Sequence, residues 1–297
     1  MNNLEKISAE TRVIDVINDP RVENFGRFIF PTDSGFPNSN LKLKDVDELL
    51  PYHSHIETST TIEVVREIFK RIDSGEKIFY PMYSESEMQK DSSKRNTGLF
   101  FFRGKSNQPF AIINAGGGFS YVGSIHESFP HAIELSRHGF NAFALKYRVG
   151  GADVACEDLA RAIEFIFEHA DELQVSTENY SLWGGSAGAR MVAYLGSYGT
   201  QKFGQKDLPR AKVVVMQYTG HRDFTANDPA TFICVGENDG IASWRVMKSR
   251  ADQLENLGIP VEFHLYKNLG HGFGLGIGTS AENWIEDAIL FWKSNMN

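Results

Sequence analysis

The chain of 297 residues is 41% hydrophobic and 23% charged, a composition typical of a folded protein and not of a disordered one. Its formal net charge of -8 argues against a nucleic-acid partner, because phosphates would meet no extended basic face. The opening residues MNNLEKISAE lack a secretory signal, and no later stretch has the roughly 18 apolar residues of a membrane span, so we expect a cytoplasmic protein.

Residues 1–76 have a less regular pattern than the rest of the chain. Turn-forming residues fill 31–40, and one amphipathic helix is expected over 62–72. We interpret this region as an N-terminal extension and a candidate cap over a site, and we interpret residues 77–297 as the main domain.

Strands and helices are expected to alternate from residue 77 onward. Within one expected helix, Leu159, Ile163 and Ile166 recur at steps of three and four residues, which places an apolar stripe against a sheet. The alternation predicts an α/β fold, with a mostly parallel sheet and helices on both of its faces. Strands are expected over 77–83, 99–103, 110–115, 141–147, 180–184, 212–217, 231–235 and 261–266, and helices over 129–138, 154–173, 187–198, 243–257 and 281–293.

Four sulfur-bearing or aromatic side chains are expected in the core. Cys156 and Cys234 lie in apolar runs, and two cysteines so placed predict neither a disulfide framework nor a metal ribbon. Trp284 and Trp292 recur at helical spacing.

A glycine-rich turn joins the expected strand 180–184 to the expected helix 187–198. Its sequence, Gly184-Gly185-Ser186-Ala187-Gly188, follows the Gly-x-Ser-x-Gly pattern of a nucleophile elbow. Such a turn needs glycines because side chains there would clash with neighbouring backbone, and it exposes the serine hydroxyl. The pattern alone is a modest signal, but between a strand and a helix it predicts that Ser186 is a nucleophile.

A serine hydroxyl needs a base to become nucleophilic, and histidine is the usual one. His271 follows the expected strand 261–266 after a short loop, at the sheet edge where sites gather, and we predict that it is this base. The base needs an orienting carboxylate between serine and histidine in chain order, and Asp239 is favoured. Glu237 on the same loop and Asp223 after the preceding strand stay as alternatives.

A tetrahedral intermediate formed on Ser186 would carry a negative charge that backbone N–H groups must receive. Ala187, directly after the serine, is expected to supply one such group. Gly117 and Gly118, which follow Gly116 at the end of strand 110–115, are expected to supply the others of this oxyanion hole. A phosphate-binding loop is the other interpretation, but its glycine spacing, lysine and acidic ribose partner are missing.

These motifs together resemble those of bacterial α/β-hydrolase-fold carboxylesterases of the hormone-sensitive-lipase and acetylesterase-like kind. The resemblance covers roughly residues 77–297, and no single motif is specific. The matching stretches are AGGGF at 115–119, KYR at 146–148, DLARA at 158–162, GGSAG at 184–188, GEND at 236–239 and HGF at 271–273.

The resemblance implies the α/β-hydrolase fold and a lipase-like serine esterase of the EC 3.1.1 type, with no cofactor and no metal. Its expected substrates are small or short-acyl esters, acetylated sugars among them, cleaved through an acyl-enzyme. It also implies that Arg148 and Asp158 form a buried pair behind the elbow.

The sequence departs from the family pattern at two points. In one departure, Ala115 stands where the family has a histidine, so other bonds must hold the glycine loop. In another, the short interval from Ser186 to Asp239 leaves little room for a lid, so a cap would come from residues 1–76.

Other functions remain open on the same motifs. A dienelactone-hydrolase-like or peptidase activity could use the same triad, and a non-catalytic binding protein on this scaffold is expected to lack a triad member. A homo-oligomer is also open. Phe119, Tyr121 and Phe273 are candidates to line an acyl or alcohol pocket.

One group of residues in the sequence has side chains that could bind a metal ion. His53 and His55, with Glu57, lack a third spaced partner and would make only a weak site. We interpret them as surface histidines.

Overall fold

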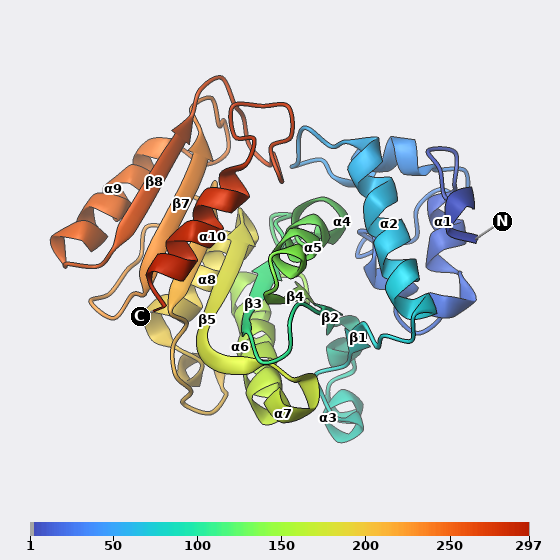
Figure 1. Ribbon diagram of the computed structural model, residues 1–297, viewed down its shortest axis with the longest axis horizontal. Coiled ribbons are helices and arrows are strands. Elements are labelled where there is room, and N and C mark those ends of the chain that lie inside the picture. The colour runs from blue at the N-terminus through green and yellow to red at the C-terminus, as the bar shows by residue number, and fades with distance from the viewer. Residues whose placement is uncertain (1–2, 297) are drawn as a thin grey trace.

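The computed structural model describes residues 3–296, and its strands form one sheet (Figure 1). The strands are β1 (Phe79–Tyr80), β2 (Gly98–Phe102), β3 (Pro109–Asn114), β4 (Asn141–Lys146), β5 (Ser176–Gly185), β6 (Val213–Gln217), β7 (Ala230–Gly236) and β8 (Val261–Tyr266). Their order is β1-β2-β4-β3-β5-β6-β7-β8. β2 is antiparallel to β1 and β4, and all other pairs are parallel, which confirms the predicted mostly parallel sheet.

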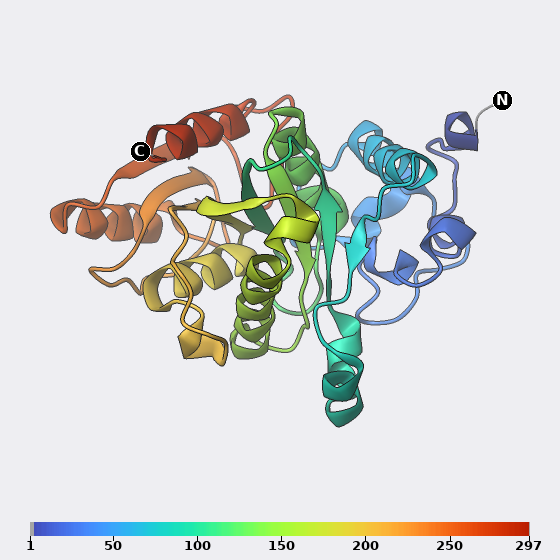
Figure 2. The ribbon, with the colours of Figure 1, turned by 60° about the horizontal axis from the view of Figure 1, so that its bottom comes forward.

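Helices cover both faces of this sheet, as predicted. They are α1 (Val13–Ile17), α2 (Thr58–Asp73), α3 (Glu85–Lys90), α4 (Ser124–Glu127), α5 (Phe129–Arg137), α6 (Ala152–Glu168), α7 (Ala170–Leu173), α8 (Ala187–Tyr198), α9 (Trp244–Asn256) and α10 (Trp284–Ser294). α5 and α10 lie on one face, and α6, α8 and α9 lie on the other (Figure 2).

The central strands are apolar along their length because neither face meets water. β3 reads PFAIIN and β6 reads VVVMQ, and nearly every one of these residues is buried. Trp284 and Trp292 are buried in the core, as predicted, and so are Cys156 and Cys234, which are free thiols. The carboxyl ends of β3, β5, β7 and β8 lie at one edge, and the loops that carry the candidate site residues begin there.

Besides moving the start of the predicted strand 180–184 back to Ser176, the structure corrects three predicted boundaries. Only Phe79–Tyr80 of the predicted strand 77–83 pairs with β2, because Pro81 has no N–H group and Ser84 caps α3. The predicted helix 154–173 is two helices, α6 and α7, which meet at His169. The last predicted helix begins at Trp284, after a residue in the left-handed region.

The N-terminal region packs beside the end of the sheet formed by β1 and β2 (Figure 1). Its predicted helix 62–72 is confirmed as the longer α2, which buries Val64, Val65, Ile68 and Phe69 on one face. α2 contacts α4 and α5. The division of the chain at residue 76 stays a prediction.

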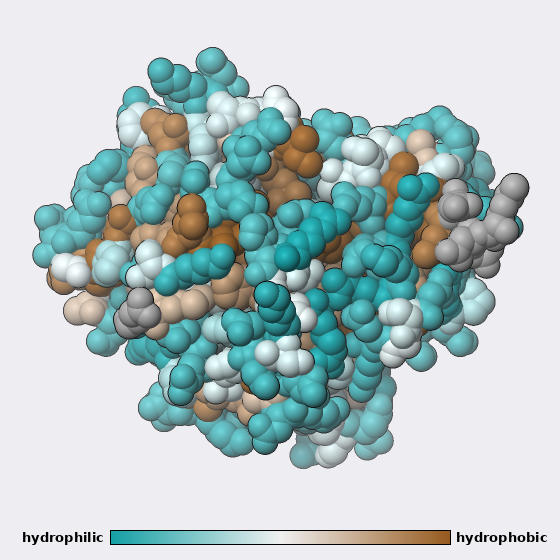
Figure 3. Space-filling model, in the orientation of Figure 1, coloured by the Kyte–Doolittle hydropathy of each residue, from teal (hydrophilic) through white to brown (hydrophobic). Residues whose placement is uncertain are grey.

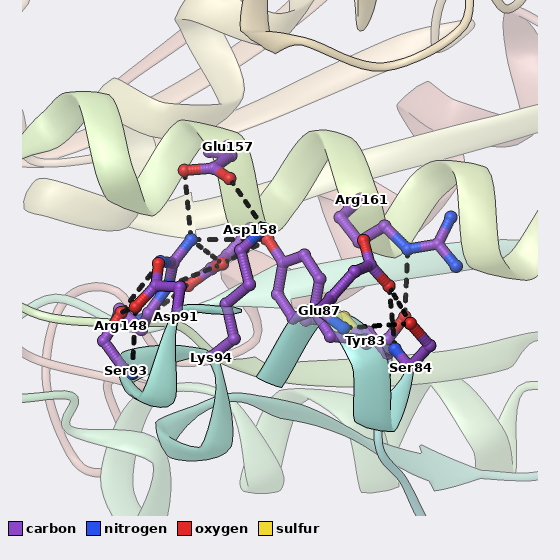
Figure 4. A network of polar contacts seen from close by, with 11 residues as sticks. Tyr83, Ser84, Glu87, Asp91, Ser93, Lys94, Arg148, Glu157, Asp158 and Arg161 are labelled. Atoms are coloured by element: carbon purple, nitrogen blue, oxygen red, sulfur yellow. Dashed lines mark hydrogen bonds and ion pairs between the residues drawn. The ribbon is translucent and has the colours of Figure 1, made fainter. Parts of the chain in front are cut away.

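Arg148, just after β4, and Asp158 on α6 form a buried ion pair (Figure 4). Arg148 Nη2 lies 2.7 Å from Asp158 Oδ1, and the two side chains are 5% and 0% exposed. The Tyr83 hydroxyl donates to Asp158 Oδ1 at 2.7 Å, and the Arg148 N–H donates to Oδ2 at 2.7 Å. The pair implied by the family resemblance is confirmed, and it ties the end of β4 to the helix that packs against α8.

The face shown in Figure 3 is mostly hydrophilic, and its hydrophobic residues form small separate groups. Within residues 3–296, no helix combines the length and the apolar character that crossing a bilayer requires.

Candidate active site

Ser186 lies on the sharp turn between β5 and α8. Its backbone has φ 51° and ψ -112°, a conformation that side-chain-bearing residues rarely adopt. A Cβ atom on Gly184 would lie 2.3 Å from the Gly188 carbonyl carbon, and one on Gly188 would lie 1.9 Å from the Asn114 carbonyl oxygen. Both flanking glycines are therefore required by close backbone packing, and the turn holds the Ser186 hydroxyl at the edge of the sheet.

The structure brings Ser186, His271 and Asp239 into one hydrogen-bonded chain. His271 Nε2 lies 2.9 Å from Ser186 Oγ, and His271 Nδ1 lies 2.7 Å from Asp239 Oδ2. The three residues come from the loops after β5, β7 and β8, which all begin at the same edge of the parallel sheet. The His271 side chain is 6% exposed and that of Asp239 is 0% exposed, so little water competes for these bonds.

Asp239 is also the best held of the three carboxylates considered from the sequence. Its Oδ1 accepts hydrogen bonds from the N–H groups of Ile241 at 2.8 Å and Ala242 at 2.7 Å. Glu237 is exposed, and Asp223 accepts a bond from the Tyr198 hydroxyl instead. The structure therefore places Asp239, and neither alternative, beside the His271 ring.

The predicted oxyanion glycines lie in a loop of left-handed backbone after β3. Gly117 has φ 140°, and a Cβ atom there would lie 2.1 Å from the Tyr121 carbonyl oxygen. Gly118 has φ 62° and lines the same cavity as Ser186. Ala187 also lines this cavity, and as the first residue of α8 its N–H has no acceptor within the helix.

The loop that begins at Ala115 is held without a histidine at that position. The Tyr147 hydroxyl donates to the Ala115 carbonyl at 2.6 Å. On the next residue, the Gly116 N–H donates to the carboxylate of Glu127 at the end of α4. Glu127 is 1% exposed and also accepts a hydrogen bond from the Tyr218 hydroxyl. The sequence does not indicate Glu127 or Tyr218. Neither residue belongs to a motif, and the contact between them spans 91 positions.

The interpretation of His53 as a surface residue is wrong. Its side chain is 2% exposed, and its Nε2 atom lies 3.3 Å from Glu127 Oε2. His55, two residues later, is exposed as expected. The prediction fails for a physical reason. The segment around His53 packs against the loop of His271, and this packing buries the His53 ring and leaves the His55 ring exposed.

Ser54 fixes this segment to the His271 loop. Its hydroxyl donates to the His271 carbonyl at 2.7 Å, and its N–H donates to the Gly272 carbonyl at 2.9 Å. The N-terminal region therefore braces the loop that carries the candidate base.

A cavity of about 270 Å³ opens next to Ser186. Phe119 lines it, in agreement with the pocket expected from the sequence, together with Arg190, Thr219, His221 and Ile241. Tyr121 and Phe273 do not line it. Both are buried, Tyr121 beside His53 and Phe273 beside Tyr218.

Within residues 3–296, no three or more His, Cys, Asp or Glu side chains are grouped so that they could hold a metal ion. The chemistry available at this edge is that of a hydroxyl, an imidazole, a carboxylate and free backbone N–H groups.

Comparison with solved structures decides the fold. An α/β hydrolase enzyme, MGS-M1, from a Medee basin deep-sea metagenome library aligns with a TM-score of 0.59 at 21% identity, over 67% of this chain and 93% of that one. The chain has the α/β-hydrolase fold. The acetyl ester-xyloside bifunctional hydrolase from Caldicellulosiruptor lactoaceticus is similar to this chain with a TM-score of 0.64 at 18% identity, over 73% of this chain and 95% of that one.

A third similar structure is the propionate-bound thermophilic esterase Est2 from Thermogutta terrifontis, with a TM-score of 0.59 at 18% identity, over 67% of this chain and 89% of that one. The BD-FAE family model matches residues 102–229. A search of curated protein sequences finds no match.

Proposed function

We propose that this protein is a serine carboxylic-ester hydrolase that acts on small or short-acyl esters, acetylated sugars among them. The observation that carries the proposal is the hydrogen-bonded chain from Ser186 through His271 to Asp239 beside a cavity. A hydroxyl, an imidazole and a buried carboxylate in this order are the parts that acyl transfer to serine requires.

In the proposed reaction, His271 Nε2 takes the proton from Ser186 Oγ as the oxygen attacks the ester carbonyl. The imidazolium that forms is stabilised by Asp239, whose other oxygen is held by two backbone N–H groups. The ring then gives its proton to the departing alcohol, and a water molecule activated by the same ring releases the acid from the acyl-enzyme.

The negative charge of the tetrahedral intermediate would be received by the N–H groups of Gly117, Gly118 and Ala187. Support for this part of the proposal comes from the loop geometry. Gly118 and Ala187 line the cavity with Ser186, and Gly117 and Gly118 both have positive φ.

A preference for small esters is supported by the size of the cavity and by the similar structures. A space of about 270 Å³ accommodates a short acyl chain or a single sugar ring more readily than a long lipid chain. Two similar structures are described as an acetyl ester-xyloside hydrolase and as an esterase with propionate bound.

The direct test is hydrolysis of p-nitrophenyl acetate by the wild-type protein and by the Ser186→Ala variant. We expect the variant to lose at least about 10³-fold in kcat while it keeps the thermal midpoint of unfolding, because the nucleophile is removed and its packing is not. A fluorophosphonate probe should label the wild type and not the variant. Equal turnover by both proteins would exclude Ser186 from the reaction. A graded series of acyl lengths, extended to acetylated sugars, would define the substrate.

A further inference from the structure

The strongest unexplained feature beside the candidate site is a buried carboxylate, Glu127, surrounded by hydrogen-bond donors. We propose that Glu127 and His53 form a buried pair that holds two loops in place beside Ser186. One is the oxyanion loop, Gly116 to Gly118, and the other is the His271 loop, which follows β8 and continues to Gly274. Both are then positioning residues for the ester hydrolysis proposed above, on which this inference rests. His53 makes the N-terminal region part of the active-site structure.

Three donors from three separate parts of the chain point at Glu127. The Gly116 N–H of the oxyanion loop donates to Oε2, and the Tyr218 hydroxyl after β6 donates to Oε1. His53 Nε2 lies 3.3 Å from Oε2. A backbone N–H can only donate, so Glu127 must accept there, and an ionised carboxylate can accept all three bonds.

The electrostatics agree with an ionised Glu127. Burial, the largest single effect, would by itself raise the pKa of this carboxyl group, and the His53 ring opposes it. The Tyr218 hydroxyl and the Gly116 N–H add to the stabilisation, and the pKa is held well below its ordinary value. Burial and the nearby carboxylate raise the pKa of Tyr218 far above its ordinary value, so its hydroxyl keeps the proton that it donates.

The ring of His53 is itself held in place from its other side. Its Nδ1 atom lies 2.8 Å from the Tyr121 hydroxyl oxygen, which accepts a hydrogen bond from the Tyr52 N–H at 3.1 Å. A proton on Nε2 faces Glu127 whether Nδ1 accepts a hydrogen bond from the Tyr121 hydroxyl or, on a protonated ring, donates one to it.

Glu127 reaches both halves of the candidate site through these partners. Its bond to Gly116 fixes the start of the oxyanion loop. The Tyr218 hydroxyl, while it donates to Glu127, accepts from the Gly274 N–H on the His271 loop at 3.2 Å. His53 is followed by Ser54, which bonds to the carbonyl of His271 itself. One carboxylate thus links the loop that receives negative charge to the loop that carries the base.

Steric contacts show how closely Glu127 lies behind the nucleophile. A Cβ atom on Gly185 would lie 2.4 Å from Glu127 Cδ. A Cβ atom on Gly116 would lie 2.8 Å from Glu127 Oε2 and 2.9 Å from Ser186 Cβ. The carboxylate and the serine therefore flank the same glycine. A negative charge at this distance opposes the formation of an oxyanion unless its donors neutralise it.

The proposal is tested by His53→Leu, Glu127→Gln and the double variant. In His53→Leu the carboxylate loses a donor and faces the oxyanion less neutralised, so we expect kcat to fall about 100-fold with KM changed less than about threefold. Glu127→Gln removes the charge and should cost about tenfold in kcat. The double variant should match Glu127→Gln and so be about tenfold more active than His53→Leu, a recovery that loss of packing alone would not produce.

His53→Gln provides a conservative rescue, because its amide can still donate to Glu127, and it should recover most of the activity that His53→Leu loses. His55→Leu, on the exposed neighbour in the same segment, is the matched control and should behave as the wild type. Near-UV circular dichroism and thermal melts establish that each variant is folded. If His53→Leu does not fold, Glu127→Gln decides the matter, since wild-type kcat in that variant would overturn the proposal.

The proposal is also wrong if the double variant loses activity by the product of the two single losses, or if folded His53→Leu keeps wild-type kcat. The rate at which a fluorophosphonate labels Ser186 gives a second readout that does not depend on the ester chosen. Absence of wild-type turnover together with normal labelling would contradict the proposed substrates and leave the pair testable by labelling. Labelling rates unchanged in every folded variant would contradict the pair alone.

Discussion

Asp239 accepts a hydrogen bond at each end of its carboxylate, from the His271 ring on one oxygen and from the N–H groups of Ile241 and Ala242 on the other. In Asp239→Asn, the side-chain amide would present either a donor or a weaker acceptor to the ring and would not stabilise an imidazolium. We expect kcat for p-nitrophenyl acetate to fall by about 10³- to 10⁴-fold with little change in stability.

Two matched variants separate this role from the alternatives. Glu237→Gln lies on the same loop but is exposed, and Asp223→Asn removes the carboxylate that bonds to Tyr198. Both should keep kcat within about threefold of the wild type. A loss in Asp223→Asn that exceeds the loss in Asp239→Asn would reassign the acid.

For single residues, the sequence indicates those that directly follow a predicted strand. It does not indicate residues that only the folded chain brings together. Ser186 is recognisable because a strained turn demands glycines on both sides. Glu127 and Tyr218 carry no such local demand, since their roles depend on contacts with Gly116 and with each other across the sheet edge. His53 was misassigned for the same reason.

Among the elements, the ion pair of Arg148 and Asp158 joins β4 to α6 in a water-free position (Figure 4). In Arg148→Met the carboxylate of Asp158 stays buried without its main partner. We expect the free energy of unfolding in urea to fall by about 3–5 kcal/mol.

The control for this loss is Arg95→Met. Arg95 pairs with Glu85 at 2.9 Å, but both side chains are largely exposed, so its loss should cost less than about 1 kcal/mol. Equal losses in the two variants would mean that burial does not set the strength of the Arg148 pair. A folded double variant, Arg148→Met with Asp158→Leu, should recover part of the stability that Arg148→Met loses.

The helices and strands themselves were largely predictable, because apolar periodicity and the residues that start or end helices are local features of the sequence. β3 through β8 and the helices that cover them lie within a few residues of their expected ranges. The deviations occur where a backbone property overrides periodicity, as at Pro81, which shortens β1, and at Asn283, whose left-handed conformation delays α10.

For the whole molecule, three buried histidines link stability to pH. Burial lowers the pKa of His126 to about 3, with the His53 ring contributing, and lowers the pKa of His131 to about 4. Burial, with the charges of Arg250 and Arg190, lowers the pKa of His221 to about 4. Below about pH 6.5 the unfolded chain takes up protons on these rings that the folded chain excludes.

The stability that these histidines contribute is therefore fully present above pH 6.5 and is lost as the pH falls towards 4. Between pH 7 and pH 5.5 we expect the free energy of unfolding to decrease by about 1 kcal/mol for each ring, or about 3 kcal/mol together. Urea titrations across this range measure the slope. His131→Phe should reduce the slope by about a third, and an unchanged slope would contradict the assignment.

The overall topology follows from the alternation of strands and helices, but the position of the N-terminal region does not. Nothing in the pattern of residues 1–76 indicates which end of the sheet they cover. Ser54 fixes their position by a contact with His271 that spans 217 positions.

The contact between Ser186 and His271 spans 85 positions, which matters while the chain is being made. Residues up to Ser186 leave the ribosome, and can begin to fold, while the imidazole of His271, the proposed base, is still unsynthesised or inside the exit tunnel. On the proposed mechanism, the nascent protein thus presents an unactivated alcohol to its surroundings until the His271 loop has been made and has docked.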